Sequence, residues 1–411
     1  IIPKKAGDQV VSASPKSDMS YVRSIKSFER NITVKSDFNY LLTATLMSLT
    51  VAGEIPTTVG VTFSIAQLPE SKMRPRVSDS RVGVAAVSKL TFDNNIAKSQ
   101  PTFIAQRWNL TPKNAKAYAQ GKGSEPIKPI RFYVDDAFPS EWKAAIKQGV
   151  ELWNKAFEQA GYQKAVEAVD FPTNDNTFDP DNIAYSCIRY VPNTSEQATS
   201  AFMANPHTGE IINASVFVPA NVGDQIYRWF FIGSAASDAS VRSSRLPQAK
   251  FNEGLRYLVA REVGRALGLL DNIGASSAFP VDSLRNATFT RTNGLAASIM
   301  ANTPFNYVAQ PGDKGVVYMP EATGLYDRHA IEWAYRYFDP AKTSVKEETA
   351  ILEKMVDKRV ANPRYRFFRT ASLAWDPRVQ EGALGNDAIK AGEYGLRKMK
   401  IVERNLYNWG K

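Results

Sequence analysis

The chain has 411 residues, enough for two domains, and its 44% apolar and 22% charged residues are ordinary for a globular protein. No apolar run approaches the ~20 residues of a membrane-spanning helix, a single cysteine excludes an internal disulfide, and two histidines exclude any site with three histidine ligands. The net charge of +10 is concentrated in residues 1–128, which hold 18 Lys and Arg against 9 Asp and Glu.

The first part of the chain, residues 1–127, is predicted to form a β-rich N-terminal domain. Residues 1–15 are small and polar, and we expect them to be frayed. From Ser20 to Phe103 the segments alternate and are rich in Val, Thr, Ile and Phe, as in Asn31–Thr45 and Thr57–Leu68. This pattern is typical of antiparallel strands.

The basic excess of this domain suggests several partners. It could contact nucleic acid, an anionic glycan or a membrane surface. No basic helix and no aromatic-basic motif accompanies the charge, so we favour a solvated basic face and predict no nucleic-acid partner. Contact with another anionic surface stays an open alternative.

A second pattern follows the linker at residues 126–129 and defines a predicted domain over residues 128–411. Pro139-Ser140 opens an amphipathic helix that Gly161 ends. The other clear elements are strands and amphipathic helices: Ile130–Val134, Ser186–Val191, Ile211–Val218, Leu255–Leu267 and Tyr326–Phe338. This mixture predicts an α+β fold for the chain.

The most informative stretch ends the helix Leu255–Leu267. Arg261 and Glu262 are followed by Arg265, Gly268 and Asp271. Positions four residues apart lie on one helical face, and a glycine turn brings the position after it back toward the helix. In the frame H-E-x-x-H-x-x-G-x-x-H, the positions of Arg261, Arg265 and Asp271 carry histidines that bind zinc, and the glutamate is the general base.

This frame resembles the zinc motif of the metzincins, and the chain resembles a family of large exported bacterial zinc-dependent metalloproteases. The further segments that fit the family include Pro129–Val134, Trp153–Phe157, Phe178–Asp181, Tyr185–Pro192, Ser276–Arg285, Ser298–Met300 and Phe305–Asp313. The resemblance implies a zincin-like domain, a Met-turn residue at Met300 and a periplasmic, outer-membrane-associated or extracellular location. Family members usually continue further, which implies truncation at the C-terminus.

All three ligand positions depart from the family motif. An arginine binds a metal only when neutral, and neutralising one at pH 7 costs roughly 8 kcal/mol. Two would cost about 16 kcal/mol, comparable to the ~10–16 kcal/mol that a good structural zinc site yields. We therefore predict no zinc, no other cofactor and no metal ligand here. Glu262 keeps the general-base position but is predicted to be inactive, because it has no metal-bound water to activate.

The charges at these positions predict what replaces the ion. Arg261 and Arg265 carry two positive charges, and Glu262 and Asp271 carry two negative ones, so the set is neutral, as a poorly solvated cluster requires. We predict that Asp271 accepts hydrogen bonds from Arg265, Arg261 or both. In the alternative, both arginines point into the open cleft and meet only water.

Four other candidates have ordinary explanations. His207 belongs to a turn, and His329 belongs to a helix where it meets a local partner. Cys187 is expected to be a buried, inert thiol. The acidic segment Asp170–Asp181 could bind calcium, but Asx turns explain its Asp and Asn residues better.

The sequence therefore favours a catalytically inactive metalloprotease homologue, a pseudopeptidase, that binds a polypeptide or a protein partner in the former substrate cleft. The strand Ile211–Val218, with Ile211, Asn213 and Ser215, is predicted to pair with an extended peptide. Two alternatives remain open: a hydrolase with metal-independent chemistry, and a structural or surface-interaction protein.

Overall fold

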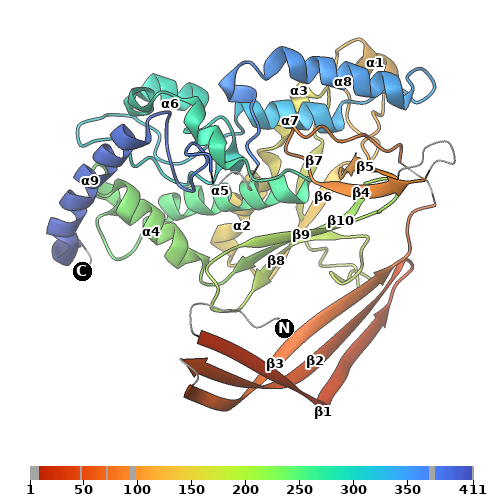
Figure 1. Cartoon of the computed structure of the whole chain (residues 1–411), viewed down its shortest axis with the longest axis horizontal. Coiled ribbons are helices and arrows are strands. Elements are labelled where there is room, and N and C mark those ends of the chain that lie inside the picture. Colours follow the sequence, from red (N-terminus) through yellow and green to blue (C-terminus); the bar gives the residue numbers. More distant parts are fainter. Residues whose placement is uncertain (1–8, 47–48, 71–72, 93–98, 370–374, 410–411) are drawn as a thin grey trace. The chain divides into compact units, whose positions relative to one another are not determined.

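The computed structural model describes residues 9–46, 49–70, 73–92, 99–369 and 375–409. Its contacts divide the chain into two compact units (Figure 1). Unit 1 comprises residues 1–70 with 177–185, and unit 2 comprises residues 71–176 and 186–411.

Unit 1 is built on a three-stranded antiparallel sheet in the order β1-β2-β3. Its strands are β1 (Gln9–Ser27), β2 (Asn31–Leu46) and β3 (Leu49–Ala66). The predicted β-rich start of the chain is thus confirmed. The prediction that the start of the chain is frayed is wrong for residues 9–15, because these residues pair with β2. Residues 1–8 lie outside the described part.

The segment 177–185 belongs to unit 1 although it is distant in sequence. The Asn31 side-chain amide donates to the backbone oxygen of Asp181 at 3.0 Å. Asp181 forms ion pairs with Lys26 and Lys35 at 3.0 and 2.6 Å, and Asp179 pairs with Lys26 at 2.7 Å. The backbone amide of Asp181 also donates to the Asp179 carboxylate at 2.9 Å, which confirms an Asx turn in this segment.

A five-stranded sheet forms the centre of unit 2, in the order β7-β6-β8-β10-β9. Four strands are parallel, and β9 is antiparallel at one edge. The bounds are β6 (Ile130–Val134), β7 (Val166–Asp170), β8 (Ser186–Val191), β9 (Thr199–Ala204) and β10 (Ile211–Pro219). The predicted strands at β6, β8 and β10 are confirmed, whereas β7 and β9 were not predicted.

Two long helices cover this sheet. Helix α2 (Ser140–Glu151) packs against β6 and β7, helix α5 (Gln248–Ala266) packs against β9 and β10, and the two helices contact each other (Figure 1). Their close approach requires Gly149, since a Cβ there would lie 2.7 Å from the backbone oxygen of Arg256. Trp153, which is fully buried, donates from its indole nitrogen to the Ala260 oxygen at 2.8 Å.

The remaining helices surround this core. They are α1 (Ala115–Ala119), α3 (Asn154–Gln159), α4 (Val222–Ser234), α6 (Ala287–Asn293), α7 (Leu325–Tyr335), α8 (Val345–Arg359) and α9 (Ala388–Trp409). The helix predicted from Ser140 to Gly161 is interrupted, so that α2 and α3 are separate. In the described part of the chain, no helix is long and apolar enough to cross a membrane.

The predicted domain boundary at residues 127 and 128 differs from the boundary between the compact units, which lies after Glu70. The hairpin β4 (Ala86–Thr91) and β5 (Gln100–Ala105) belongs to unit 2. The reason is backbone hydrogen bonding: Ala85 donates to the Gly268 oxygen and Leu270 to the Gly83 oxygen, each at 2.8 Å. These bonds join the segment before β4 to the loop after α5.

Candidate functional site

The last turn of α5 and the loop after it form the candidate site. Arg261, Glu262 and Arg265 lie on α5, and the chain then turns at Gly268, whose φ is +88°. A Cβ at Gly268 would lie 2.4 Å from the backbone oxygen of Gln106, so a side chain would clash as well as being strained. The predicted helix and glycine turn are confirmed, and together they bring Asp271 back beside the helix.

The four residues Arg261, Glu262, Arg265 and Asp271, called the Asp271 cluster below, form a connected set of ion pairs. Arg265 makes a bidentate contact with Asp271, with Nη2 to Oδ2 at 2.8 Å and Nε to Oδ1 at 3.2 Å. Arg261 Nη2 donates to Asp271 Oδ1 at 3.1 Å, and Arg265 Nη1 donates to Glu262 Oε1 at 2.7 Å. The prediction that Asp271 pairs with these arginines is confirmed.

The cluster is only partly accessible to water. The side chains of Arg261, Arg265 and Asp271 are 16%, 31% and 25% exposed, and that of Glu262 is 4% exposed. Burial lowers the pKa of Arg265, but the hydrogen bonds and charges of Asp271 and Glu262 raise it more, so the pKa of Arg265 lies above its ordinary value. Arg265 is therefore firmly cationic at neutral pH.

Glu262 has both carboxylate oxygens engaged. Its Oε1 accepts from Arg265, and its Oε2 accepts from the hydroxyl of Ser200 at 2.9 Å. Ser200 lies on the edge strand β9 and was not identified from the sequence. A general base needs an oxygen within reach of the proton that it removes. In this geometry, both oxygens of Glu262 are hydrogen-bonded within the protein instead.

The side chains at the three ligand positions are not suitable ligands for a zinc ion. Zinc sites use thiolate, neutral imidazole and carboxylate ligands, whereas Arg261 and Arg265 present protonated guanidinium groups. The remaining candidate ligand, Asp271, already accepts from both arginines. Among the described residues, no group of three or more His, Cys, Asp and Glu side chains could hold a metal ion.

Met300, which the family resemblance implies as the Met-turn residue, lies beneath α5. It is fully buried in the short 3-10 turn Ile299–Ala301, and its backbone oxygen accepts from Asn272 at 3.0 Å. A Cβ at Gly264 would lie 2.5 Å from the Met300 sulfur. The sulfur therefore packs directly against the helix one residue before Arg265, while the Met-turn role itself stays a prediction.

The prediction that the strand Ile211–Val218 pairs with a peptide is wrong. Ile211, Asn213 and Ser215 lie on β10, which pairs with β8 on one side and with β9 on the other. An interior strand has no free edge to offer a peptide. The edge strand beside α5 is β9, which the sequence shows only as a small alternating segment before the turn at Asn205–Gly209. A hairpin pattern with β10 could have identified it.

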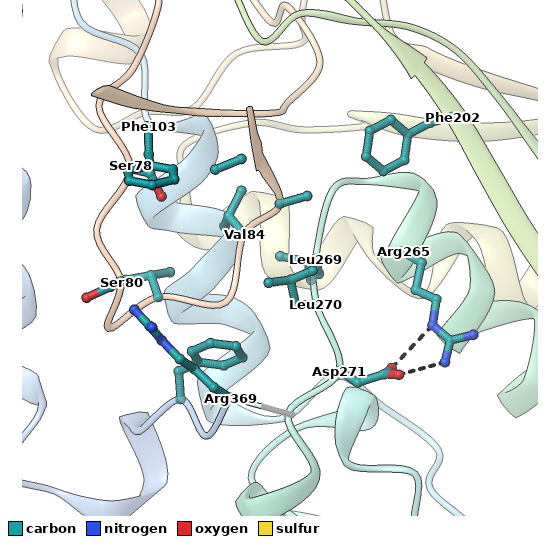
Figure 2. A pocket seen from close by; sticks show the side chains of 14 residues that line it. Ser78, Ser80, Val84, Phe103, Phe202, Arg265, Leu269, Leu270, Asp271 and Arg369 are labelled. Carbon is teal, nitrogen blue, oxygen red and sulfur yellow. Dashed lines mark hydrogen bonds and ion pairs between the residues drawn. The ribbon is translucent and has the colours of Figure 1, made fainter. Parts of the chain in front are cut away.

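Two cavities flank the Asp271 cluster, and Arg265 and Asp271 line both. The larger, called the apolar cavity, has a volume of about 720 Å³. Its larger apolar lining residues are Val82, Val84, Phe103, Phe202, Leu269, Leu270 and Phe367. In Figure 2 the paired Arg265 and Asp271 lie at one side of it, with Phe103 and Val84 opposite.

The smaller, called the polar cavity, has a volume of about 280 Å³ and is lined by Thr199, Arg261 and Glu262 among others. Strand β9 connects the two cavities, because Thr199 at its start lines the polar cavity and Phe202 lines the apolar one. An extended segment along β9 would therefore pass both.

The other sequence candidates lie away from this cluster. His207 is exposed in the turn between β9 and β10, where its backbone amide donates to the Asn205 side chain at 2.9 Å. Cys187 is buried in β8. His329 is buried in α7, and its Nδ1 lies 3.0 Å from Nη1 of Arg359. The expectations of a turn residue, a buried thiol and a helix residue with a local partner are confirmed.

His329 makes the stability of the fold depend on pH. Burial, and then the charge of Arg359, lower the pKa of His329 to about 4 from its ordinary 6.5. The unfolded chain therefore takes up this proton first as the pH falls. The stabilising contribution is fully present above pH 6.5 and is lost between pH 6.5 and 4. We expect it to amount to about 3 kcal/mol.

The test compares urea unfolding at pH 7 and pH 4. Wild-type protein should lose about 3 kcal/mol more than His329→Gln between these pH values. Other groups that titrate in this range contribute equally to both proteins, so their effect on the free energy of unfolding cancels. Asp327, whose pKa burial raises to about 6, is one of them. His207→Gln is the matched control and should behave like wild type, because His207 is exposed. Equal losses in wild type and His329→Gln would contradict the assignment.

The comparisons with known proteins agree with this architecture. Residues 243–411, which include the Asp271 cluster and Met300, match the model of a family described as Met-zincin. Residues 2–113 match the model of a domain of unknown function. No curated protein and no solved structure matches the chain significantly. The α+β class is thus confirmed, with a β-rich N-terminal region and a metzincin-like C-terminal domain.

Proposed function

We propose that this chain, whose metzincin-like domain carries the Asp271 cluster, is a metalloprotease homologue without zinc catalysis that binds polypeptide in the former substrate cleft. The observation that carries the proposal is the bidentate pair of Arg265 with Asp271, joined by Arg261. These three side chains occupy the motif positions of the zinc ligands and form ion pairs with one another.

The state of Glu262 supports the loss of catalysis. A metalloprotease glutamate acts on a water that the metal has made acidic. Glu262 instead accepts from Arg265 and Ser200, so it neutralises an arginine and connects α5 to β9. Its role in this proposal is structural.

Polypeptide binding is supported by the edge of the sheet. In the described residues, β9 pairs with β10 on one side, and no strand pairs with its other side. Every second residue of an edge strand points its backbone N–H and C=O groups outward, where an extended peptide can pair with them. Such pairing needs no metal, so it can persist after catalysis is lost.

The flanking cavities suggest which peptides would bind. Side chains of an extended peptide alternate in direction, so a peptide paired with β9 presents alternate residues to the cavities. The apolar cavity, with Phe202 on β9 as part of its wall, fits a large aliphatic or aromatic side chain. We therefore propose unfolded segments with bulky apolar residues as ligands.

The proposal is tested with a permanently unfolded polypeptide. Reduced, carboxymethylated α-lactalbumin with a fluorescent label should bind the full chain saturably, as measured by fluorescence anisotropy. Phe202→Ala should weaken this binding roughly tenfold, since it removes one wall of the apolar cavity. Leu406→Ala on α9 removes an exposed apolar side chain elsewhere and should leave binding unchanged.

The opposite outcomes are equally clear. Absence of saturable binding by wild-type protein at millimolar polypeptide would support a structural role without a peptide ligand. Cleavage of the polypeptide that persists in Glu262→Gln would support metal-independent hydrolysis. Export from a bacterial cell, which the family resemblance implies, is part of the proposal and is tested by fractionating cells that express the full-length protein.

A further inference from the structure

A third cavity, called the Arg107 cavity below, has a volume of about 200 Å³ and shares no lining residue with the two cavities beside Asp271. It lies between the segment before β4, the segment after β5, the end of α7 and the start of α8. Arg74, Arg76, Arg107 and Glu348 contribute charged groups to its lining. All of these residues belong to unit 2.

Two of the three arginines have evident structural partners. Arg76 is 3% exposed and donates to Glu348 at 2.6 Å and to the backbone oxygens of Trp333 and Ala334, so that it caps the C-terminal end of α7. Arg74 also contacts Glu348 and donates to the Thr343 oxygen. The single carboxylate of Glu348 thus balances the charge of one of these two arginines. Their contacts within the protein explain why both are present, without any ligand.

Arg107 has no such explanation. Arg107 is 8% exposed, and among the described residues its side chain makes one hydrogen bond, from Nη2 to the Arg74 backbone oxygen at 3.1 Å. Its Nε is buried without a partner. Among the described residues, no carboxylate lies within 4.0 Å of its guanidinium. A buried cation without an anion is costly, and each buried donor without an acceptor adds to that cost.

The surrounding charges increase the imbalance. Arg336 also lines the cavity, and it shares Glu332 with Arg359. Five arginines here thus face two carboxylates. Asp339 pairs with Lys342 and does not line the cavity.

Arg107 nevertheless remains charged. Burial, and then the charge of Arg76, lower the pKa of Arg107 to about 9. The group is therefore protonated at neutral pH, and the cavity has a positive charge that the described residues do not balance.

We propose that the Arg107 cavity binds a small inorganic oxyanion of the phosphate or sulfate type. Arg107 would donate from Nη1 and from the second N–H of Nη2, the end-on fork of a guanidinium that suits such anions. The hydroxyl of Thr111 and the amide of Asn109, which also line the cavity, add neutral donors. The volume suits an anion of five heavy atoms with some water, at roughly 30 Å³ per water molecule.

The experiment measures binding to the full chain by isothermal titration calorimetry and by thermal unfolding, with inorganic phosphate, sulfate and chloride at equal ionic strength. We expect saturable binding of phosphate or sulfate and a rise in melting temperature that chloride does not produce. Arg107→Met should weaken phosphate binding by roughly tenfold or more. Lys400→Gln, which removes an exposed charge on α9, should leave it unchanged.

Arg107→Lys provides a second test that keeps the charge and removes the fork. It should bind phosphate several-fold more weakly than wild type, and it decides the question if Arg107→Met does not fold. Equal responses of wild type to phosphate, sulfate and chloride would overturn the proposal. So would phosphate binding that neither Arg107 variant weakens.

Discussion

Asp271→Ala should lower the free energy of unfolding by about 2 kcal/mol. The substitution leaves Arg265 and Arg261 without their shared acceptor. Arg265 keeps its pair with Glu262, so the partly buried cluster is left with two positive charges against one negative charge. Removal of one partner from a fully buried ion pair costs roughly 3–5 kcal/mol. The side chains of Arg261, Arg265 and Asp271 are 16% to 31% exposed. Water therefore screens part of the charge, and the expected loss of stability is smaller than for a fully buried pair.

Urea unfolding followed by circular dichroism measures this change. The control is Glu158→Ala, which breaks an ion pair with Lys155 whose two side chains are 51% and 75% exposed, and it should show no change beyond error. Adding Arg261→Met to Asp271→Ala should restore part of the lost stability, because Arg261 then lacks a hydrogen-bonded carboxylate whereas Arg265 keeps Glu262. A change within ~0.5 kcal/mol for Asp271→Ala would indicate that water solvates the arginines.

Restoring the three histidines should restore zinc binding. In the variant with Arg261→His, Arg265→His and Asp271→His, two imidazoles lie on one face of α5, and a third follows the turn at Gly268, whose geometry is intact. Such a site can yield on the order of 10 kcal/mol of binding free energy. We expect stoichiometric zinc after purification without chelator, and less than a tenth of that in wild type.

Metal analysis by mass spectrometry, followed by competition with a chromogenic chelator, measures the difference. The matched control replaces Arg261, Arg265 and Asp271 with glutamine, which removes the same charges without adding imidazole, and it should bind no zinc. Stoichiometric zinc in the wild-type protein, lost in the glutamine control, would refute the proposed loss of the metal. Peptidase activity is not expected to return with zinc, because the Ser200 hydroxyl still donates to the Glu262 carboxylate and outer contacts also tune a metal site.

If the proposed loss of zinc is correct, the neutral charge of the cluster explains how this loop keeps its place without the metal. A zinc ion joins a helix to the loop beyond it by three bonds. Here Asp271 makes the same connection by accepting from Arg265 and Arg261. Replacement of a metal by ion pairs keeps the loop near the helix, but it requires every member to be paired, which is why single substitutions at Asp271 should matter.

The sequence by itself determined the local features of the site. The four-residue spacing of Arg261 and Arg265 fixes their common face because the helical period is 3.6 residues. Gly268 predicts the turn, and the residue types at the ligand positions carry the prediction that zinc is not bound. The strands at Ile130–Val134 and Ser186–Val191 also follow from local composition. Each of these conclusions depends on neighbours within about a dozen residues.

Only the tertiary structure decided which parts of the chain meet. That β9 is the sheet edge, and that β10 is interior, follows from pairing between segments whose local patterns look alike. The unit boundary after Glu70 results from backbone bonds to the loop after α5, almost two hundred residues away. Arg107, which has no carboxylate partner among the described residues, shares its cavity with the end of α7 and with Glu348 of α8, both far away in the sequence. Such contacts leave no periodic trace, since they depend on packing rather than on local conformation.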